Sequence, residues 1–316
     1  MDAIILPAAD STTCHPLTVH RSISEVPVAN TTLLKAQIAA LATAGFEHVH
    51  RADGDDIDPH TAPDGRSRLA LVSNVWLAPV DLRRLRRGEV TTLIDPTDES
   101  TVASVSGVAE ADLVVAHMSD ESFRLHYPWE FLRLNALLLA DIETDIQGEL
   151  HPAAHVDGVL QLGAGSRVLP GVYIEGNVVI GKNCKIGPNC YLRGPTCIGD
   201  DCHVGQAVEI KASIIMSNSS VAHLSYFGDS IVGEHSNVGA GSITANLRHD
   251  GSNNRSFVGD SLVDTGRRKL GAIIGDHVHL GINTSLYPGR KIWPHGITVP
   301  GQLVNHDIVT DPREYE

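Results

Sequence analysis

The sequence predicts two folds in one chain, an α/β N-terminal domain and an all-β parallel β-helix of hexapeptide repeats. An aliphatic residue occurs at every sixth position from Leu150 onward as far as Val221. Four positions after each of these aliphatic residues comes a small or aliphatic residue. Before residue 125, apolar segments with strand-like spacing alternate with segments that have helix-like spacing. A short fixed period is typical of a β-solenoid, whereas alternating strands and helices are typical of a parallel or mixed α/β sheet.

The sixfold period predicts which side chains fill the β-helix. Three hexapeptides make one triangular coil, in which the aliphatic residue points inward and the small residue fills a corner. Coils stack about 4.8 Å apart, so residues eighteen positions apart lie side by side. The predicted inward aliphatic residues are Leu150, Val156, Leu162, Val168, Ile174, Ile180, Ile186, Leu192, Ile198, Val204, Ile210 and Met216. Cys184, Cys190 and Cys202 take the small inward position, so we expect them to pack rather than to form disulfides or bind metal.

The period is interrupted twice. It breaks after Val221, returns at Val232 and Val238, and is present again from Ile274 to Val304. The segments 222–231 and 245–272 are therefore expected to leave the prism. Segments that interrupt a regular scaffold are where function usually lies.

Residues 1–125 are predicted to form the α/β domain. Its expected strands are AIIL, FEHVH, LALVSNVWL, VTTLI and DLVVAH, and its expected helices lie in TTLLKAQIAALATAG and VDLRRLRRG. The acidic, Pro- and Gly-rich stretch between residues 49 and 68 predicts a solvated loop. Residues 126–148 are expected to form a linker helix that begins near Pro128, and residues 149–316 to form the β-helix.

Composition excludes several classes of partner. The chain has 316 residues, 42% of them hydrophobic, and a net charge of −14. Without a Lys/Arg-rich stripe to neutralise phosphates, nucleic acid is not expected to bind. The N-terminus lacks the basic start and long apolar core of a signal peptide, and no stretch approaches 18 apolar residues, so we expect a cytoplasmic protein that does not bind membranes.

Two motifs near the N-terminus, HPLT (15–18) and PVAN (27–30), resemble the start of sugar-1-phosphate nucleotidylyltransferases. The resemblance implies a shortened, Rossmann-like nucleotidyltransferase domain. A phosphate-cradling loop needs glycines and a cation, yet residues 8–14 contain neither Gly nor Arg. The family lysine has no counterpart in residues 22–25, and Val75 and Trp76 stand where the family has Gly and a metal-binding Asp. We therefore expect a degenerate domain, with Mg²⁺ required only if nucleotidyl transfer survives.

The stretch VAHLSYFGDSIVGEHSNVGAGSITANLRHDG carries a second resemblance, supported by LRGP and VEIK before it and by TGRRKLGAIIGDHVHLGIN after it. Residues 125–305 resemble the bifunctional N-acetylglucosamine-1-phosphate uridyltransferase/glucosamine-1-phosphate acetyltransferase family, in particular its archaeal-type members. The resemblance implies a left-handed parallel β-helix, a homotrimer with sites between subunits, and a role in nucleotide-sugar biosynthesis. It also implies an amino-sugar 1-phosphate as substrate and acetyl-CoA as co-substrate.

The resemblance assigns a catalytic base and two phosphate-binding cations. His223 matches the family's general base, and an imidazole with an ordinary pKa near 6.5 can accept a proton at neutral pH. Arg193 and Lys211 match the residues that hold the sugar phosphate. Because they are eighteen positions apart, they are expected on adjacent coils, where an anion between them would offset their repulsion.

Further matches concern the sugar and coenzyme A. The residues implied to position the sugar are Tyr226, Asn237 and Asn246. Ala240 matches a position whose backbone contacts coenzyme A. The basic cluster Arg267, Arg268 and Lys269 is expected to bind coenzyme A phosphates or the sugar phosphate of a neighbouring subunit, or to be a solvated turn. Ile282 and Pro300 depart from the small residues that the family has near coenzyme A.

The resulting hypothesis is an acetyl-CoA-dependent N-acetyltransferase acting on an amino-sugar 1-phosphate, with glucosamine-1-phosphate favoured over its galactosamine epimer. The alternatives are a sugar-1-phosphate nucleotidylyltransferase that uses UTP or dTTP, and a non-catalytic sugar-phosphate-binding protein. A zinc carbonic anhydrase on the same prism is disfavoured, because the chain lacks the required His spacing.

Overall fold

The computed structural model describes residues 1–52 and 67–310. The chain divides into two compact units. The first comprises residues 1–11, 22–26 and 31–126, and the second comprises residues 12–21, 27–30 and 127–316. Two short segments of the predicted N-terminal domain thus group with the solenoid. The predicted loop between residues 49 and 68 lies largely outside the described residues.

The first unit is built on a six-stranded mixed sheet with strand order β4-β1-β5-β8-β7-β9. These strands are β1 (Asp2–Leu6), β4 (Val49–Arg51), β5 (Arg68–Val72), β7 (Thr92–Ile94), β8 (Thr101–Ser106) and β9 (Val115–His117). β1 is parallel to β4 and β5, while β8 is antiparallel to β5 and β7. Two further strands, β6 (Val75–Trp76) and β10 (Phe123–Arg124), form an antiparallel pair. The remaining short elements are β3 (Thr31–Thr32), η2 (Ile23–Glu25) and η3 (Glu110–Asp112).

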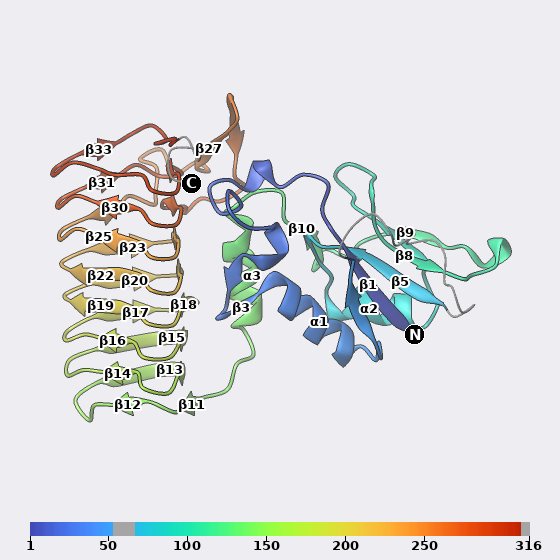
Figure 1. Ribbon diagram of the computed structural model, residues 1–316, viewed down its shortest axis with the longest axis horizontal. Coiled ribbons are helices and arrows are strands. Elements are labelled where there is room, and N and C mark those ends of the chain that lie inside the picture. The colour runs from blue at the N-terminus through green and yellow to red at the C-terminus, as the bar shows by residue number, and fades with distance from the viewer. Residues whose placement is uncertain (53–66, 311–316) are drawn as a thin grey trace. The chain divides into compact units, whose positions relative to one another are not determined.

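Two helices, α1 (Leu33–Thr43) and α2 (Pro79–Arg86), complete this unit (Figure 1). The side chain of Thr32 caps α1 by accepting a hydrogen bond from the backbone N–H of Lys35, and Pro at the first position favours the start of α2. Leu41 and Leu82 are fully buried in the same core as the sheet residue Leu71. The alternation of strands and helices predicted for residues 1–125 is confirmed.

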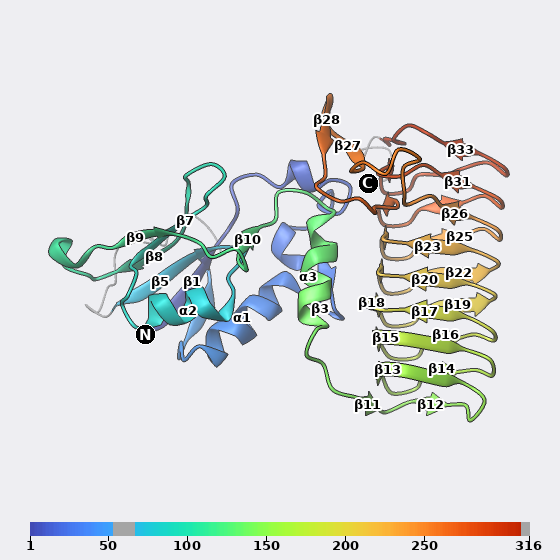
Figure 2. The same ribbon diagram turned by 180° about the vertical axis from the view of Figure 1, so that it is seen from behind.

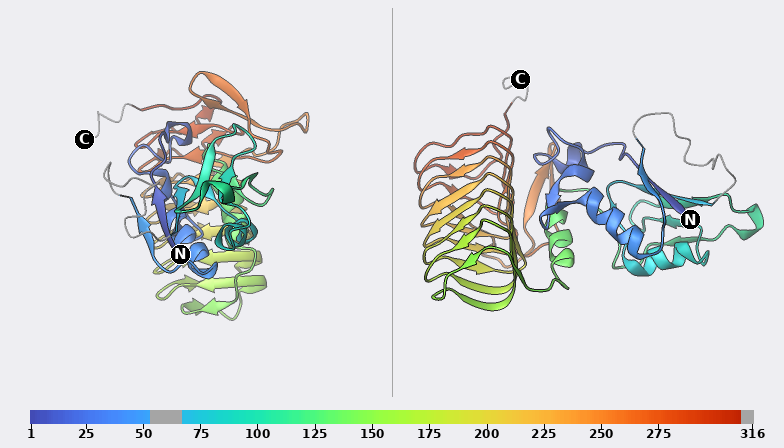
Figure 3. Two further views of the ribbon diagram at one scale, coloured as in Figure 1. Left: turned by 90° about the vertical axis from the view of Figure 1, so that its right-hand side faces the viewer. Right: turned by 60° about the horizontal axis from the view of Figure 1, so that its bottom comes forward.

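The second unit is a parallel β-solenoid with three faces (Figures 1 and 3). The first face is a seven-stranded sheet of β12 (Glu149–Leu150), β14 (Arg167–Val168), β16 (Lys185–Ile186), β19 (His203–Gln206), β22 (Ser220–His223), β25 (Asn237–Val238) and β30 (His279–Leu280). A fourteen-stranded sheet bends across the other two faces, because the long strands β13 (His155–Leu162) and β15 (Tyr173–Ile180) run through the corner between them.

The second face continues from the first halves of these long strands. Its other strands are β17 (Tyr191–Arg193), β20 (Glu209–Lys211), β23 (Tyr226–Gly228), β26 (Ile243–Thr244), β31 (Ser285–Leu286) and β33 (Leu303–Val304). The third face comprises β11 (Asp145–Ile146), β18 (Thr196–Ile198), β21 (Ile214–Ile215), β24 (Ile231–Val232), β29 (Ile273–Ile274) and β32 (Lys291–Ile292), together with the second halves of β13 and β15.

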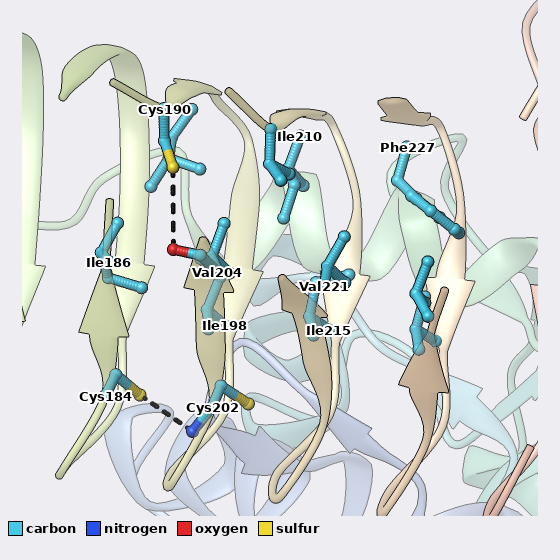
Figure 4. Packing of buried hydrophobic residues seen from close by; sticks show 14 of the residues in the cluster. Cys184, Ile186, Cys190, Ile198, Cys202, Val204, Ile210, Ile215, Val221 and Phe227 are labelled. Carbon is cyan, nitrogen blue, oxygen red and sulfur yellow. Dashed lines mark hydrogen bonds between the residues drawn. The ribbon is translucent and has the colours of Figure 1, made fainter. Parts of the chain in front are cut away.

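Aliphatic side chains and small buried thiols fill the prism, as Figure 4 shows. Cys184, Cys190 and Cys202 are buried and free, as the hexapeptide period predicted. Burial raises the pKa of the Cys190 thiol to about 11, so it stays protonated at neutral pH. These cysteines are packing residues.

The inward register differs from the prediction at one point. Ile186 pairs with Val204 at a distance of 18 residues, but Val204 pairs with Val221 only 17 residues further on. The shortening occurs after Ile210, where Ile215 and not Met216 lies in the core and pairs with Ile198. The coils lose one residue at the corner that follows β20, where Ala212 adopts a positive φ of 47°.

The expectation that residues 222–231 leave the prism is therefore wrong. β22, β23 and β24 continue the three faces with 17-residue coils, and the broken period reflects this shortening. Residues 245–272 do leave the prism, as predicted. They contain the antiparallel hairpin of β27 (Arg255–Val258) and β28 (Ser261–Asp264), which stands away from the coils (Figure 2).

The third face is covered by α3 (Glu130–Leu138), which Figures 1 and 2 show beside the coils. The strand β2 (Pro27–Val28) and the two residues after it belong to the same unit. Asn135 at the buried side of α3 donates to the carbonyl of Pro195, and its Oδ1 accepts from the backbone N–H of Ala29. Asn30 donates to the carbonyl of Ile198. The helix predicted for residues 126–148 therefore occupies a shorter range, and the PVAN motif packs on the solenoid.

The segment 12–21, which includes η1 (Thr12–Cys14), also belongs to the solenoid unit. Arg21 forms ion pairs with Glu234 at 2.9 Å and Asp276 at 2.5 Å, and the His15 ring meets the edge of Trp293. The stretch that resembles a nucleotide-binding loop is thus anchored by contacts to the coils. Across residues 1–52 and 67–310, no helix has the length and hydropathy to cross a membrane.

Candidate active site on the second face of the solenoid

Two cations lie side by side on the outer surface of the second face. Arg193 at the end of β17 pairs in register with Lys211 at the end of β20, as the eighteen-residue spacing predicted. Arg193 is held by Glu209 at 3.0 Å and lies 3.7 Å from Glu175. The hydrogen bond to Glu209 raises the pKa of Arg193, which stays charged. The anion expected between the two cations can therefore be supplied by the protein's own carboxylates.

Lys211 begins a chain of polar contacts that links three of the predicted site residues. Its Nζ lies 2.9 Å from Oδ2 of Asp229, a carboxylate that is almost fully buried. The same oxygen accepts a hydrogen bond from Nδ2 of Asn246 at 2.7 Å, and that amide lies 3.1 Å from the hydroxyl of Tyr226. Lys211, Tyr226 and Asn246 are thus connected through Asp229.

Gly228 allows these side chains to converge. A Cβ at Gly228 would overlap the Tyr226 hydroxyl and would come within 2.7 Å of Nδ2 of Asn246. Burial, together with the charges of Glu209 and Asp229, raises the pKa of Tyr226. Its phenol is therefore protonated at neutral pH and can donate a hydrogen bond to a ligand.

His223 lies at the corner between the first and second faces, at the end of β22. Its imidazole is exposed, and among the described residues its ring nitrogens have no hydrogen-bond partner. Its backbone carbonyl accepts hydrogen bonds from the Gly241 N–H at 3.1 Å and from the Ser225 hydroxyl at 2.8 Å. The corner backbone is thus fixed while the imidazole remains available to accept a proton.

The same corner carries Ala240 and the two departures from the family pattern. The Asn283 N–H donates to the Ala240 carbonyl, and the Gly301 N–H donates to the Ile282 carbonyl. Ala240, Ile282 and Pro300 therefore follow one another along this corner, one coil apart. The Ile282 side chain is 51% exposed, so an acyl donor lying along the corner would meet an apolar branch there.

The remaining predicted residues make no hydrogen bond or ion pair with this group among the residues that the structure describes. Asn237 is exposed on β25 of the first face, in register with Ser220 and His279, and does not hydrogen-bond the others within the described part of the chain. Arg268 and Lys269 are exposed. Arg267 is partly buried in a cleft with Ala212, Pro195 and α3, close enough to Asp229 for their charges to interact, although burial lowers its pKa.

Sequence reasoning did not single out Glu209 and Asp229, the carboxylates that hold the two cations. Both lie inside motifs already recognised, VEIK and YFGD. In a chain with 38 acidic residues, a carboxylate carries little signal by itself. The eighteen-residue spacing between Lys211 and Asp229 was the available signal, because it predicts contact across adjacent coils.

Groups of metal-ligating side chains occur elsewhere. Among the described residues, two clusters bring three potential ligand atoms within 4.8 Å of one another, and both belong to the first unit. They are Asp2 with Glu47 and His48, and Asp95 with Asp98 and His126. In the second cluster, Arg124 lies 3.0 Å from Asp98 and already supplies positive charge. Neither cluster contains a candidate site residue.

The first unit has a small cavity at the carboxyl ends of β1 and β5, where an open α/β sheet would bind a ligand. It encloses about 60 Å³ and is lined by Ala8, Ser11 and Ser73, among others. Arg51, the cation in its wall, forms an ion pair with Glu25, whose pKa is lowered to about 2 by hydrogen bonds from Ser22 and Arg51. Small-molecule pockets usually enclose about 300–1,000 Å³. The enclosed volume of this cavity is well below that range.

Comparison with known proteins identifies related chains. The family model described as the GMPPB C-terminal domain matches residues 174–298. A bifunctional protein GlmU from Methanococcus aeolicus is 43% identical over 189 residues, which cover 60% of this chain and 46% of that protein. The bifunctional protein GlmU from Methanocaldococcus jannaschii is 40% identical over the same shares of the two chains.

Two further comparisons complete this set. A bifunctional sugar-1-phosphate nucleotidylyltransferase/acetyltransferase from Sulfurisphaera tokodaii is 47% identical over 102 residues, 32% of this chain and 25% of that protein. A solved hexapeptide transferase family protein from Anaplasma phagocytophilum aligns with 51% of this chain and 71% of its own, at a TM-score of 0.24 and 16% identity. The matches span about half or less of the length of the curated relatives. Over the matched residues, the chain is similar to curated proteins named bifunctional protein GlmU or bifunctional sugar-1-phosphate nucleotidylyltransferase/acetyltransferase.

Proposed function

We propose that the protein is an acetyl-CoA-dependent N-acetyltransferase acting on an amino-sugar 1-phosphate, with glucosamine-1-phosphate as the favoured substrate. The observation that carries the proposal is the polar chain Lys211, Asp229, Asn246 and Tyr226 beside Arg193, one corner away from His223. Cations suit a phosphate, while amide and hydroxyl groups suit the hydroxyls of a sugar.

The phosphate would bind to cations that protein carboxylates already hold in place. Arg193 and Lys211 are held by Glu209 and Asp229 in the free protein. A bound phosphate adds charge-assisted hydrogen bonds to both cations without requiring either to move to another coil. The carboxylates then keep the cations oriented before the substrate arrives, which reduces the ordering cost of binding.

The chemical step is acyl transfer to the amine. The nitrogen attacks the thioester carbonyl, a C–N bond forms, and the C–S bond breaks to release coenzyme A. His223 accepts the proton lost by the amine and can return it to the departing sulfur. Backbone N–H groups near Ala240 would stabilise the oxyanion, a role in which fixed donors are effective. Asn237 would contact the sugar, and Arg267, Arg268 and Lys269 would contact phosphate groups of coenzyme A or of a neighbouring subunit's substrate.

We further propose a homotrimer in which the sites lie between subunits. His223 and Ala240 occupy an exposed corner, so a second subunit beside that corner would close the site from water. The exposed Leu224 and Ile282 side chains, 64% and 51% exposed, would be covered by such contact.

Nucleotidyl transfer is proposed to be lost. The small cavity in the first unit, the paired state of Arg51 and the absence of Gly and Arg from residues 8–14 all argue against triphosphate binding. On this proposal Mg²⁺ has no role in the reaction, and the first unit serves folding or assembly.

A substrate panel tests the proposal. Free coenzyme A is measured with a thiol reagent after mixing the protein with acetyl-CoA and glucosamine-1-phosphate, galactosamine-1-phosphate or unphosphorylated glucosamine. We expect turnover with an amino-sugar 1-phosphate and at least about 10-fold lower kcat/KM without the phosphate. Absence of turnover with both phosphates would refute acetyl transfer, and calorimetry would then separate a sugar-phosphate-binding protein from a nucleotidylyltransferase.

A further inference from the structure

A second cleft opens where residues 245–272 leave the prism. It encloses about 570 Å³ and is lined by residues of the hairpin β27–β28 and of the turn that follows β31. Its volume falls within the range of about 300–1,000 Å³ that is usual for small-molecule sites. The cleft lies at the corner between the second and third faces. The corner that carries His223 and Ala240 is the other edge of the second face. The cleft adjoins the proposed sugar-phosphate site, because Ala245 and Leu247 on either side of Asn246 line it, but the residues proposed to act in acetyl transfer are not part of its lining.

One wall of the cleft is apolar and partly aromatic. Phe257 and Leu262 come from the two strands of the hairpin, and Tyr287 and Pro288 come from the turn after β31. Tyr287 is 50% exposed and Leu262 is 42% exposed. A flat ring placed against these side chains would remove exposed apolar surface from water.

Excess positive charge lies beside these apolar side chains, where the Arg290 guanidinium is 5.4 Å from the centre of the Phe257 ring. Arg290 is only 9% exposed, and its guanidinium donates to the carbonyls of Arg255 and Pro288 rather than to a carboxylate. Lys291, beside it in sequence, is 2% exposed and its nearest carboxylate among the described residues, Asp307, is 4.0 Å away. Buried cations are normally paired with anions, so this region has one positive charge more than its buried carboxylates offset.

Two more arginines extend this charge to the mouth of the cleft. Arg255 is exposed, and its side chain has no hydrogen-bond or ion-pair partner within the described ranges. Arg248 is already bound by Asp250 through two hydrogen bonds at 3.0 and 2.6 Å. Arg255 and Arg290 are therefore the cations available to an incoming anion, in a protein whose net charge is −14.

We propose that this cleft binds a phosphorylated nucleoside. The base would pack against Tyr287 and Leu262, and the phosphates would contact Arg255 and Arg290. The combination of a planar apolar wall with two available guanidinium groups fits a ring and an anion in one ligand. The ligand could be a free nucleotide or the nucleotide end of coenzyme A, which share this chemistry.

The side chain of Asn254 connects the cleft to the candidate active site. Asn254, in the wall of the cleft, donates from Nδ2 to the backbone carbonyl of Asn246 at 3.1 Å. Asn246 in turn contacts Asp229 and Tyr226. An occupant of the cleft can thus influence the position of a residue proposed to hold the sugar.

The test is isothermal calorimetry of the full chain with UDP, ADP, coenzyme A and inorganic phosphate at fixed ionic strength. We expect a nucleoside diphosphate to bind, and Arg255→Glu to weaken it by about 10-fold or more. Lys185→Glu makes the same change of charge on an exposed residue of β16 and should alter the affinity by less than about 2-fold. Tyr287→Ser removes the ring without changing charge and should weaken the nucleotide while leaving phosphate binding unchanged.

The outcomes separate the two sources of the ligand and the failure of the idea. If coenzyme A displaces bound UDP or ADP and binds more tightly than either, the cleft is assigned to the nucleotide end of coenzyme A. If UDP or ADP binds and coenzyme A does not displace it, the cleft is assigned to a free nucleotide. No binding by any nucleoside phosphate, equal binding of inorganic phosphate, or binding unaffected by both Arg255→Glu and Tyr287→Ser would overturn the proposal. None of these results depends on turnover, so acetyl transfer is judged separately with His223→Ala.

Discussion

Oδ2 of Asp229 lies 2.9 Å from Nζ of Lys211, which belongs to the preceding coil. The two residues are also joined through the backbone, because the Asp229 N–H donates to the Lys211 carbonyl. Asp229 is in the left-handed region with φ 52° at the tight corner of a 17-residue coil. Asp229 thus contacts the lysine that is proposed to bind phosphate through both its backbone and its side chain.

Asp229→Asn tests this relationship. The substitution keeps the shape of the side chain and its tolerance of positive φ, but leaves Lys211 without its counter-charge and faces one amide with another. We expect the apparent affinity for the sugar phosphate, measured as KM, to weaken by about 10-fold. Glu149→Gln removes a carboxylate from an exposed ion pair with Arg167 and serves as the control. If both substitutions changed KM equally, the proposal that Asp229 supports phosphate binding would be contradicted.

Gly228→Ala tests the close approach of Tyr226 and Asn246. The new methyl group would overlap the Tyr226 hydroxyl, so the ring and the amide must move apart. We expect kcat/KM to fall by about 10-fold or more, since small displacements of positioning groups have large effects on rate. Gly88→Ala, in the first unit, places Ala at a positive φ of 70°, unlike Gly228→Ala, but its new methyl group meets no atom within 4 Å. It should lower stability slightly and leave turnover unchanged.

A column of histidines should make the solenoid unit sensitive to acid. The rings of His235, His277 and His295 are stacked 4.9 and 4.8 Å apart, and His20 meets His295 at 6.2 Å. Burial, and then the charges of His277 and His20, lower the pKa of His295, although Asp276 opposes this effect. A lowered histidine pKa means that the unfolded chain binds the proton more readily.

The contribution of uncharged His295 to the free energy of unfolding is therefore fully present above about pH 6.5, the ordinary histidine pKa. It is lost as the pH falls through the lower pKa that His295 has in the folded protein. Urea midpoints at pH 8 and pH 5.5 measure this loss. His295→Asn keeps a residue that tolerates the positive φ of 62° at this turn and should show a smaller loss. The carboxylates Glu234 and Asp276, held by Arg21, remain in both proteins. An identical loss in both proteins would exclude His295 as its source.

The revised register predicts which residue supports the core after Ile210. Ile215→Ala should lower the free energy of unfolding by about 2–5 kcal/mol, because the side chain is fully buried among the inward aliphatic residues. Ile215→Val should cost about 0.5–1.5 kcal/mol. Denaturant unfolding followed by circular dichroism measures both values. If Ile215→Ala lowered the free energy of unfolding by less than Ile215→Val does, the register would be contradicted.

Most of the solenoid could be predicted from the sequence because the inward positions accept only a few residue types. The prediction failed where two neighbouring residues both suit the inward position, so that the sequence does not distinguish one register from the other. Ile214, Ile215 and Met216 are all buried, so a residue lost at the preceding turn left the aliphatic run apparently intact. The segments 12–21 and 27–30 were assigned to the α/β domain for a related reason. Their packing on the coils depends on long-range contacts such as Arg21 with Asp276, which a local pattern does not encode.

The candidate site was predictable in part. The spacing of Arg193 and Lys211 correctly predicted their adjacency, because one coil separates them. Glu209 and Asp229 were not singled out, since their importance depends on the atoms they contact. The second cleft could not be predicted, because Phe257 lies in β27 whereas Tyr287 and Arg290 lie in the turn after β31, and only the path of residues 245–272 brings these segments together.

The central claim is that His223 accepts the amine proton during acetyl transfer. The most direct measurement is the rate of coenzyme A release from acetyl-CoA and glucosamine-1-phosphate by wild type, His223→Ala and the exposed control His151→Ala. The account predicts a fall in kcat of about 100-fold or more for His223→Ala, with sugar-phosphate affinity retained, and unchanged turnover for His151→Ala. Wild-type turnover that persists in His223→Ala would contradict the account.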